Sequence, residues 1–159
     1  MPPITALLHT ANHALRLGRA LEMLLPCSEI VIVDHGSTDG TRRIARRYGA
    51  RVVSAGDHAP AKHYLDLARN EWIFCLKPQE SITESLQASL FEWSALPESV
   101  VAGGYSVFVR EQTGDGWLEL PAPETRLIPS GWCLWREGLP AHDPSAVVLE
   151  GQLLRFSLP

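Results

Sequence analysis

A chain of 159 residues, of which 45% are hydrophobic and 20% charged, has the length and balance of one ordinary globular domain. Its 14 lysines and arginines against 18 aspartates and glutamates give a net charge of −4, which argues against nucleic acid as a partner. The three cysteines are far apart and form no C-x-x-C pair, so neither a disulfide framework nor a cysteine zinc site is indicated.

Residues 1–96 alternate short apolar runs with helical patterns. Strands are predicted at 4–8, 30–33, 51–54 and 72–76, because each is a short apolar run typical of a buried parallel strand. A helix is predicted after each strand: from Ala14 until Pro26, through the arginine-rich stretch that Gly49 ends, over 60–69, and after a capping box at Ser81 and Glu84. Four such repeats predict a largely parallel sheet with right-handed crossovers.

Residues 97–159 have a different texture. A strand-like run at 100–110 is followed by a stretch rich in proline and tryptophan, and then by short alternating pieces at 146–149 and 153–156. No polar linker or internal repeat separates the two parts. We therefore predict a single domain over 1–159, in which 1–96 form an α/β half and 97–159 an irregular, antiparallel β section.

The stretch VIVDHGSTDGT, residues 31–41, combines a buried strand with a turn that leads into a helix. Asp34 ends the strand and is expected at the mouth of the sheet, where a carboxylate can accept hydrogen bonds from a base N–H or a ribose hydroxyl. The alternative is a helix cap in a tight turn. Neither G-x-G-x-x-G nor a P-loop is present, which argues against dinucleotide and ATP sites.

With its surroundings, this stretch resembles the family 2 glycosyltransferases, whose nucleotide-diphospho-sugar domain opens with a strand, a polar turn and V-V-D-x-G-S-T-D-G-T. The resemblance continues through YGARVV at 48–53 and Ala61-Lys62-His63-Tyr64 into ARNEWIFCL, and it is nearest to the branch that adds sugars to the lipopolysaccharide core. It implies a GT-A-like, Rossmann-like α/β fold, a mostly parallel sheet flanked by helices, with a short antiparallel section at the C-terminus. It also makes Thr10 and Asp34 the candidates for nucleoside binding. Lys62, and Lys77 through its positive charge alone, are the candidates for diphosphate binding.

In that family, the strand that matches WIFCL leads into Asp-x-Asp, whose carboxylates contact the ribose and hold a divalent cation. This chain has Lys77-Pro78-Gln79 there, and only Glu80 is acidic. Because a lysine repels the cation that it replaces, we expect no metal cofactor bound in the family's manner. Either Lys77 replaces the metal as a charge that faces the diphosphate, or the domain has kept the fold and lost the chemistry. A solvated loop lysine is a third reading.

The family also implies a candidate base in the C-terminal section. Ala141-His142-Asp143 matches a Val-His-Glu turn, so His142 and Asp143 are the candidate catalytic residues, with Asp143 as the base for an acceptor hydroxyl. The alternative is a loop histidine and aspartate with no catalytic duty. A later family histidine is Arg155 here.

Two other sets of side chains admit two readings each. The arginines between 42 and 51 are expected to form a solvated helix face, or alternatively a patch for anionic lipid headgroups. Trp117, Trp132 and Trp135 are expected to fill core space, although aromatic faces also stack on sugars. The absence of a basic leader and of any run long enough to span a bilayer predicts a cytoplasmic protein, with contact at the inner face of the membrane left open.

Together these features predict a glycosyltransferase-like protein that binds a nucleotide or nucleotide-sugar and whose catalytic chemistry is degenerate. One alternative is an active, metal-independent, inverting glycosyltransferase of cell-envelope polysaccharide synthesis. The other is a non-enzymatic interaction module paired with an active transferase as its protein partner.

Overall fold

The computed structural model describes residues 2–56, 59–97 and 103–157. Its helices are α1 (Ala14–Glu22), α2 (Thr41–Arg47), α3 (Ala61–Leu65) and α4 (Glu84–Ser94). Its strands are β1 (Ile4–Thr10), β2 (Glu29–Asp34), β3 (Arg51–Ser54), β4 (Trp72–Cys75), β5 (Glu80–Ile82), β6 (Tyr105–Thr113), β7 (Gly116–Glu119), β8 (Glu124–Pro129), β9 (Trp135–Arg136), β10 (Leu139–Pro140) and β11 (Val147–Arg155).

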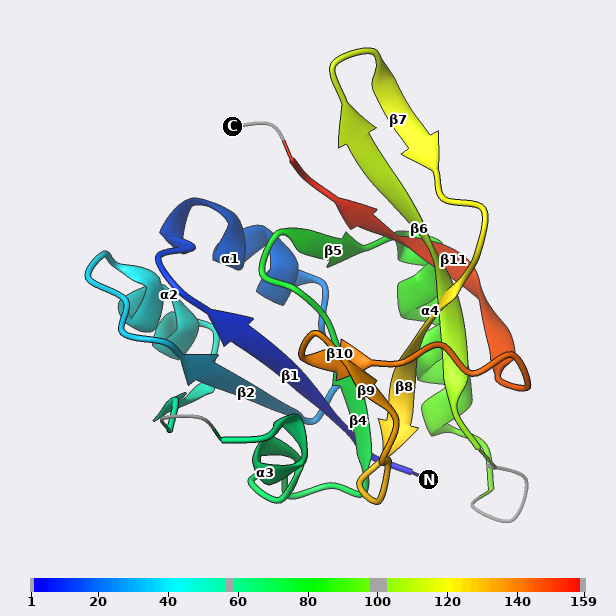
Figure 1. Ribbon diagram of the computed structural model, residues 1–159, viewed down its shortest axis with the longest axis horizontal. Helices are drawn as coiled ribbons and strands as arrows, with labels where there is room; N and C mark the ends of the chain where they lie inside the picture. The colour runs from blue at the N-terminus through cyan, green and yellow to red at the C-terminus, as the bar shows by residue number, and fades with distance from the viewer. Residues whose placement is uncertain (1, 57–58, 98–102, 158–159) are drawn as a thin grey trace.

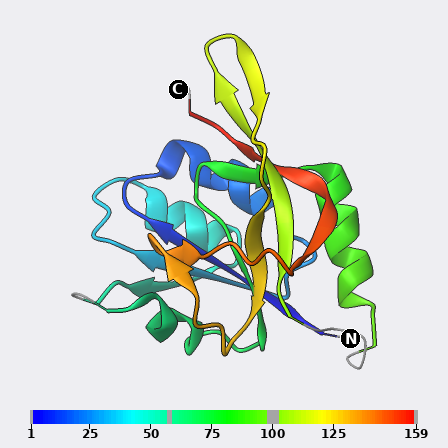
Figure 2. The same cartoon turned by 45° about the vertical axis from the view of Figure 1, so that its right-hand side comes forward.

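One large sheet runs through both halves of the chain, in the order β3-β2-β1-β4-β8-β6-β11-β5, with β7 paired to β6 (Figure 1). Strands β3, β2, β1 and β4 are parallel to one another, as the sequence predicts. The C-terminal strands extend this sheet: β8 is antiparallel to β4 and β6, whereas β11 is parallel to β6. A separate two-stranded antiparallel sheet, β9–β10, lies against the β1–β4 part of the sheet in both Figures 1 and 2.

The two faces of the sheet bury different sets of side chains because successive strand residues point to opposite sides. One face packs against α1, α2 and α4, with Ile4, Ala6 and Leu8 of β1 in that cluster. The other face packs against α3, and Trp135 of β9 is partly buried there. Helices α1, α2 and α4 therefore cover one face of the sheet, and α3 and the β9–β10 sheet cover the other.

Three predicted details differ from the structure. The capping box is wrong, because Ser81 lies in β5, which pairs with β11, and the N-cap of α4 is Thr83, whose side chain accepts from the Leu86 N–H at 3.2 Å. Helix α3 ends at Leu65 instead of 69, since the next amides bond three residues back. Residues 100–102 of the predicted strand lie outside the described residues, and β6 begins at Tyr105.

The outer side of α2 carries four of the five arginines predicted for a solvated helix face: Arg42, Arg43, Arg46 and Arg47. The prediction is wrong for Arg51, which lies in β3 and pairs with Glu29 at 3.3 Å. Trp117 is wrong as a core residue, because it lies exposed on β7, where the Phe156 ring packs against it edge to face. The cysteines are free. Among the described residues, no helix is long and apolar enough to cross a bilayer.

Candidate functional site

The carboxyl ends of β1, β2 and β4 form one edge of the sheet, and β1 lies between the other two. In an open α/β sheet, ligands bind outside such strand ends, where neighbouring connections leave in different directions. Two cavities open at this edge, and the turn between β9 and β10 contributes to both.

The first cavity, which we call the histidine cavity, has a volume of about 520 Å³. Strand ends β1 and β2 supply His9 and His35, helix α3 supplies Tyr64, and the β9–β10 sheet supplies Trp135. Smaller groups complete the lining: Gly56, Ala59, Ala61, Glu137 and Gly138. Flat rings from four elements therefore surround one opening at the carboxyl edge.

His9 and His35 are joined directly. The Nδ1 atom of His9 lies 2.9 Å from Nε2 of His35, and the Tyr64 ring meets the His9 ring edge to face at 5.0 Å. Burial, followed by the neighbouring His35, lowers the pKa of His9 to about 4. The neutral His9 ring can therefore share one hydrogen bond with His35, in which one ring nitrogen donates and the other accepts.

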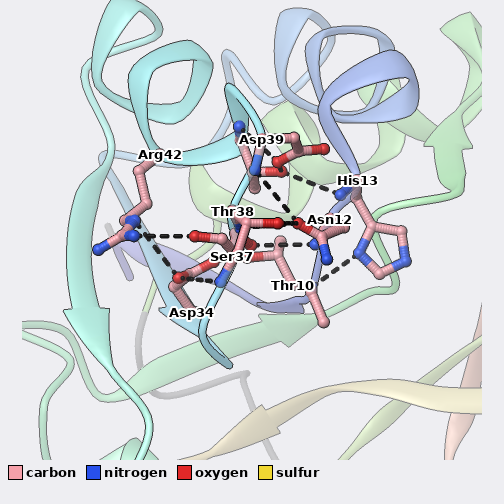
Figure 3. Close-up of polar contacts among 10 residues, drawn as sticks. Thr10, Asn12, His13, Asp34, Ser37, Thr38, Asp39 and Arg42 are labelled. Carbon is pink, nitrogen blue, oxygen red and sulfur yellow. Dashed lines mark hydrogen bonds and ion pairs between the residues drawn. The ribbon is translucent and has the colours of Figure 1, made fainter.

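Asp34, predicted to bind the nucleoside, is buried and already bonded. Its carboxylate accepts from the Ser37 N–H at 3.0 Å, from the Ser37 hydroxyl, and from the Thr10 hydroxyl at 3.1 Å (Figure 3). Arg42 Nε lies 3.6 Å away. Burial raises the pKa of Asp34, but these hydrogen bonds and the arginine outweigh it, so the pKa is lowered and the group stays charged.

The rest of the family motif ties two loops together. Asn12, at φ 57°, accepts at Oδ1 from the Thr38 N–H at 2.8 Å and the Asp39 N–H at 3.3 Å (Figure 3). Asp39 in turn accepts from the Ala14 N–H at 3.2 Å and from both the N–H and the hydroxyl of Thr41. The motif thus fixes the β1–α1 loop against the β2–α2 loop, which sets the positions of His9 and His35.

The second cavity, which we call the cationic cavity, has a volume of about 310 Å³. Its polar lining comes from the end of β4, from β8, from the β9–β10 sheet and the loop after it, and from β11. Those side chains are Lys77, Glu124, Arg136, Glu137, His142 and Arg155. Glu137 lines the histidine cavity as well, so the two cavities share a wall.

A buried ion network lies beside the cationic cavity. Arg126 and Glu80 are fully buried and form a bidentate pair, Nη1 to Oε1 at 2.7 Å and Nη2 to Oε2 at 2.9 Å. Arg155 adds Nε to the same Oε2 at 3.0 Å, and the Lys77 N–H donates to Oε1 at 2.8 Å. Glu124 pairs with Arg126 at 2.8 Å and with Arg155 at 3.1 Å. Burial raises the pKa of Glu80, but the attraction of Arg126 outweighs it, so the pKa is lowered.

The resemblance implies a divalent cation at the end of β4, and the side chains there do not fit one. Both oxygens of Glu80 are taken by guanidinium and backbone N–H donors, so this carboxylate has no free lone pair directed at a cation. Lys77 adds a positive charge to the same position. Within residues 2–56, 59–97 and 103–157, no three histidine, cysteine or acidic side chains are placed to hold a metal ion.

Some of the predicted site residues line a cavity, some are buried, and some line neither cavity. Lys77 and His142 both line the cationic cavity, whereas Lys62 is exposed on α3 and lines neither cavity. Thr10 lies buried behind the histidine cavity, bonded to Asp34. Asp143 lines neither cavity and accepts from the N–H and hydroxyl of Ser145, which lower its pKa.

Several residues that line the cavities were missed from the sequence. His9 and His35 end neighbouring strands, a signal that could have identified them, but the sequence shows no metal-type spacing between its histidines. Trp135 was weighed as core or sugar contact, and it both packs on the sheet and lines the histidine cavity. Arg136 carries no local signal, because only the β9–β10 turn brings it beside Lys77.

Comparison with known proteins gives the following relatives. No family model matches the chain. The lipopolysaccharide core biosynthesis glycosyltransferase LpsC of Rhizobium meliloti (strain 1021) is 30% identical over 162 residues, which cover 94% of this chain and 56% of LpsC. The chain therefore spans little more than half the length of that relative.

Two solved structures share the arrangement of strands and helices. TarS of S. aureus, in complex with UDP-GlcNAc, matches with a TM-score of 0.59 at 19% identity, over 76% of this chain and 37% of TarS. Glucosyl-3-phosphoglycerate synthase from Mycobacterium tuberculosis, in complex with Mn²⁺, UDP and glucosyl-3-phosphoglycerate, matches with a TM-score of 0.51 at 18% identity, over 72% of this chain and 46% of that one. At this level of identity the likeness shows a common fold.

Proposed function

This chain belongs to the family 2 glycosyltransferases and has their GT-A fold, and on that premise we propose that it binds a nucleotide or nucleotide-sugar in the histidine cavity. The observation that carries the proposal is an open cavity of about 520 Å³ at the carboxyl ends of β1 and β2, lined by His9, His35, Tyr64 and Trp135. Its volume lies in the range of roughly 300–1,000 Å³ that is usual for small-molecule sites.

The lining suits a nucleobase. Aromatic faces give a flat ligand a large contact area at a small entropic cost, and a few polar atoms then fix its orientation. The His9–His35 pair leaves one nitrogen on each ring for such a contact, since the other two face each other at 2.9 Å. TarS binds UDP-GlcNAc and the mycobacterial synthase binds UDP, which supports uridine nucleotides as the first ligands to test.

Binding without efficient transfer is the form of this function that the geometry supports best. Asp143, the candidate base, is held by Ser145 away from both cavities, and its lowered pKa makes it a weaker proton acceptor. Metal-independent sugar transfer is the second candidate. It is favoured by Lys77, whose ammonium group lines the cationic cavity and has no ion-pair partner in the described part of the chain.

An interaction module with a vestigial site would be favoured by a blocked cavity. The histidine cavity is open instead, and the buried Pro78 does not line it. The open cavity supports ligand binding over a purely structural role. A protein partner would then act together with a bound ligand, and not in place of one.

A thermal-shift titration tests the proposal. UDP, GDP, dTDP, CDP and UDP-sugars would each be added with Mn²⁺ and again with EDTA. Ligand at about a hundred times its dissociation constant should stabilise the native state by roughly 2.7 kcal/mol. The expected result is a shift with at least one nucleotide, and no shift with any of them would contradict nucleotide binding.

Two matched tryptophan variants connect that result to the cavity. Trp135→Ala should abolish or strongly reduce the shift, because its ring forms one wall of the histidine cavity. Trp117→Ala, on the exposed β7, should leave the shift unchanged. Equal effects from the two variants would show that the ligand binds elsewhere. A transfer assay with radiolabelled UDP-sugar then separates a binding protein from an active transferase.

A further inference from the structure

The two places where the chain departs from the pattern that the resemblance implies meet at Glu80. Lys77, Pro78 and Gln79 stand where the resemblance implies metal-binding aspartates, and Arg155 stands where it implies a histidine. In the structure, Arg155 Nε donates to Glu80 Oε2 at 3.0 Å, and both Arg155 and Lys77 line the cationic cavity. The lost carboxylates and the gained arginine therefore belong to one arrangement of charges.

From this arrangement we infer that the cationic cavity binds the phosphate groups of the nucleotide directly, through Lys77, Arg136 and Arg155, with no divalent cation between protein and phosphate. The inference rests on the proposed function, because it assigns the part of the same ligand that extends beyond the histidine cavity.

The charges in the cavity favour an anion. Neither Lys77 nor Arg136 has an ion-pair partner among the residues that the structure describes. Arg155 is shared between Glu80, Glu124 and Glu111, at 3.0, 3.1 and 3.7 Å, yet part of its side chain remains accessible.

The acidic groups around the cavity leave this excess of positive charge in place. Glu124 is already neutralised by Arg126 and Arg155, so Glu137 is the one lining carboxylate, within the described residues, that no ion pair accounts for. Two unpaired cations and a third partly available guanidinium suit a group with several anionic oxygens.

The geometry also connects the two cavities. Strands β9 and β10 are joined by a two-residue turn, Glu137 and Gly138, and Glu137 lines both cavities. A nucleotide whose base lies against Trp135 can therefore extend past this turn towards Arg136 and Lys77. One ligand could fill both spaces without a change in the fold.

The same turn offers a gain-of-function test. Glu137 and Gly138 have φ of 52° and 80°, which is the conformation of a type I′ turn. Asn-Gly is the preferred pair for that turn, whereas glutamate is unfavourable at positive φ. Glu137→Asn should therefore relax the backbone and remove the one carboxylate that opposes phosphate binding.

Isothermal titration calorimetry with the whole chain tests the inference. Uridine, UMP, UDP and inorganic pyrophosphate would be titrated in EDTA and again in Mn²⁺. We expect UDP to bind at least about tenfold more tightly than UMP in EDTA, the gain from one hydrogen bond to a charged group. We also expect pyrophosphate to bind alone, and Mn²⁺ to add no affinity.

The variants locate the effect. Lys77→Ala and Arg136→Ala should each remove at least about tenfold of the UDP affinity and leave that of uridine unchanged. Glu137→Asn should raise UDP affinity about fivefold, the effect of one unit charge at 4 Å in water. Arg47→Ala, on the exposed face of α2, is the control for loss of positive charge and should change neither.

Three results would overturn the inference: UDP that binds only with Mn²⁺, UDP no tighter than UMP, or UDP affinity that survives both cation variants. Uridine that binds in any of these cases would leave the proposed function intact. If pyrophosphate binds in EDTA and no nucleoside binds, the inference about the cationic cavity is supported. The histidine cavity is then refuted as a nucleoside site.

Discussion

Replacing Glu80 by glutamine should destabilise the native state by several kcal/mol, although the two side chains have the same shape. The carboxylate is fully buried and accepts hydrogen bonds from Arg126, Arg155 and the Lys77 N–H. A glutamine amide retains one acceptor oxygen and turns an NH₂ group towards guanidinium donors. It also leaves Arg126 buried with less opposing charge.

The size of the loss of stability depends on the hydrogen bonds that Arg126 retains in the variant. Breaking a buried ion pair by removing one partner costs about 3–5 kcal/mol. Arg126 still bonds Glu124 at 2.8 Å and the Cys75 carbonyl at 3.1 Å, so the lower end, about 3 kcal/mol, is expected. At roughly 2–4 °C per kcal/mol for a chain of this size, the melting temperature should fall by roughly 6–12 °C.

Urea denaturation followed by circular dichroism measures the effect. Glu80→Gln, Arg126→Met and the double variant form a cycle, and the double variant should lose at least about 1 kcal/mol less than the sum of the single ones. Arg110→Met is the control, because its pair with Glu119 is exposed and should be worth less than about 1 kcal/mol. Losses below about 1 kcal/mol for Glu80→Gln, or additive single losses, would refute the reasoning.

Two further predictions concern His9 and the contact between β11 and α4. The pKa of His9 is lowered from 6.5 to about 4, so the unfolded chain binds more protons than the folded chain between those pH values. The free energy of unfolding should be fully present above pH 6.5 and should fall by up to about 3 kcal/mol as the pH drops to 4. His9→Gln should reduce this pH dependence in denaturation curves. Gly151→Ala should lower the free energy of unfolding by more than about 2 kcal/mol, because φ is +99° and a Cβ would lie 2.2 Å from the Leu86 nitrogen. The control Gly114→Ala, which has open space around it, should lower it by less than about 1 kcal/mol. Equal losses of stability in the two variants would contradict the clash.

Much of the fold could be predicted from the sequence because its parallel half is encoded locally. The apolar run at Ile30–Val33 can be buried on both faces only inside a sheet, and it forms the centre of β2. Gly49, predicted as a left-handed end to α2, has φ 77°. Ser81 was misplaced because a capping pattern is local, whereas its pairing with β11 joins residues that are about seventy positions apart.

The candidate site was predicted less completely. The motif at 31–41 identified the family, but its Asp34 accepts from Ser37 and Thr10 and its Asp39 from the Ala14 N–H. The cavity walls come from His9, His35 and Trp135. A motif records which residue types are needed, and does not record whether a carboxylate faces a ligand or a backbone amide. That choice depends on which donors the fold brings within hydrogen-bond distance of the carboxylate.

The sequence by itself determined the family, the parallel α/β half and the presence of Lys77, Pro78 and Gln79 after the fourth strand, because each is a property of residue order along one segment. Only the tertiary structure decided what surrounds that strand end. It brought Arg126 from β8 and Arg155 from β11 onto Glu80, and Arg136 from β9 beside Lys77. Electrostatic contacts depend on distance in space, so a carboxylate that is exposed in one fold is buried and neutralised in another, and no pattern within a single segment specifies which.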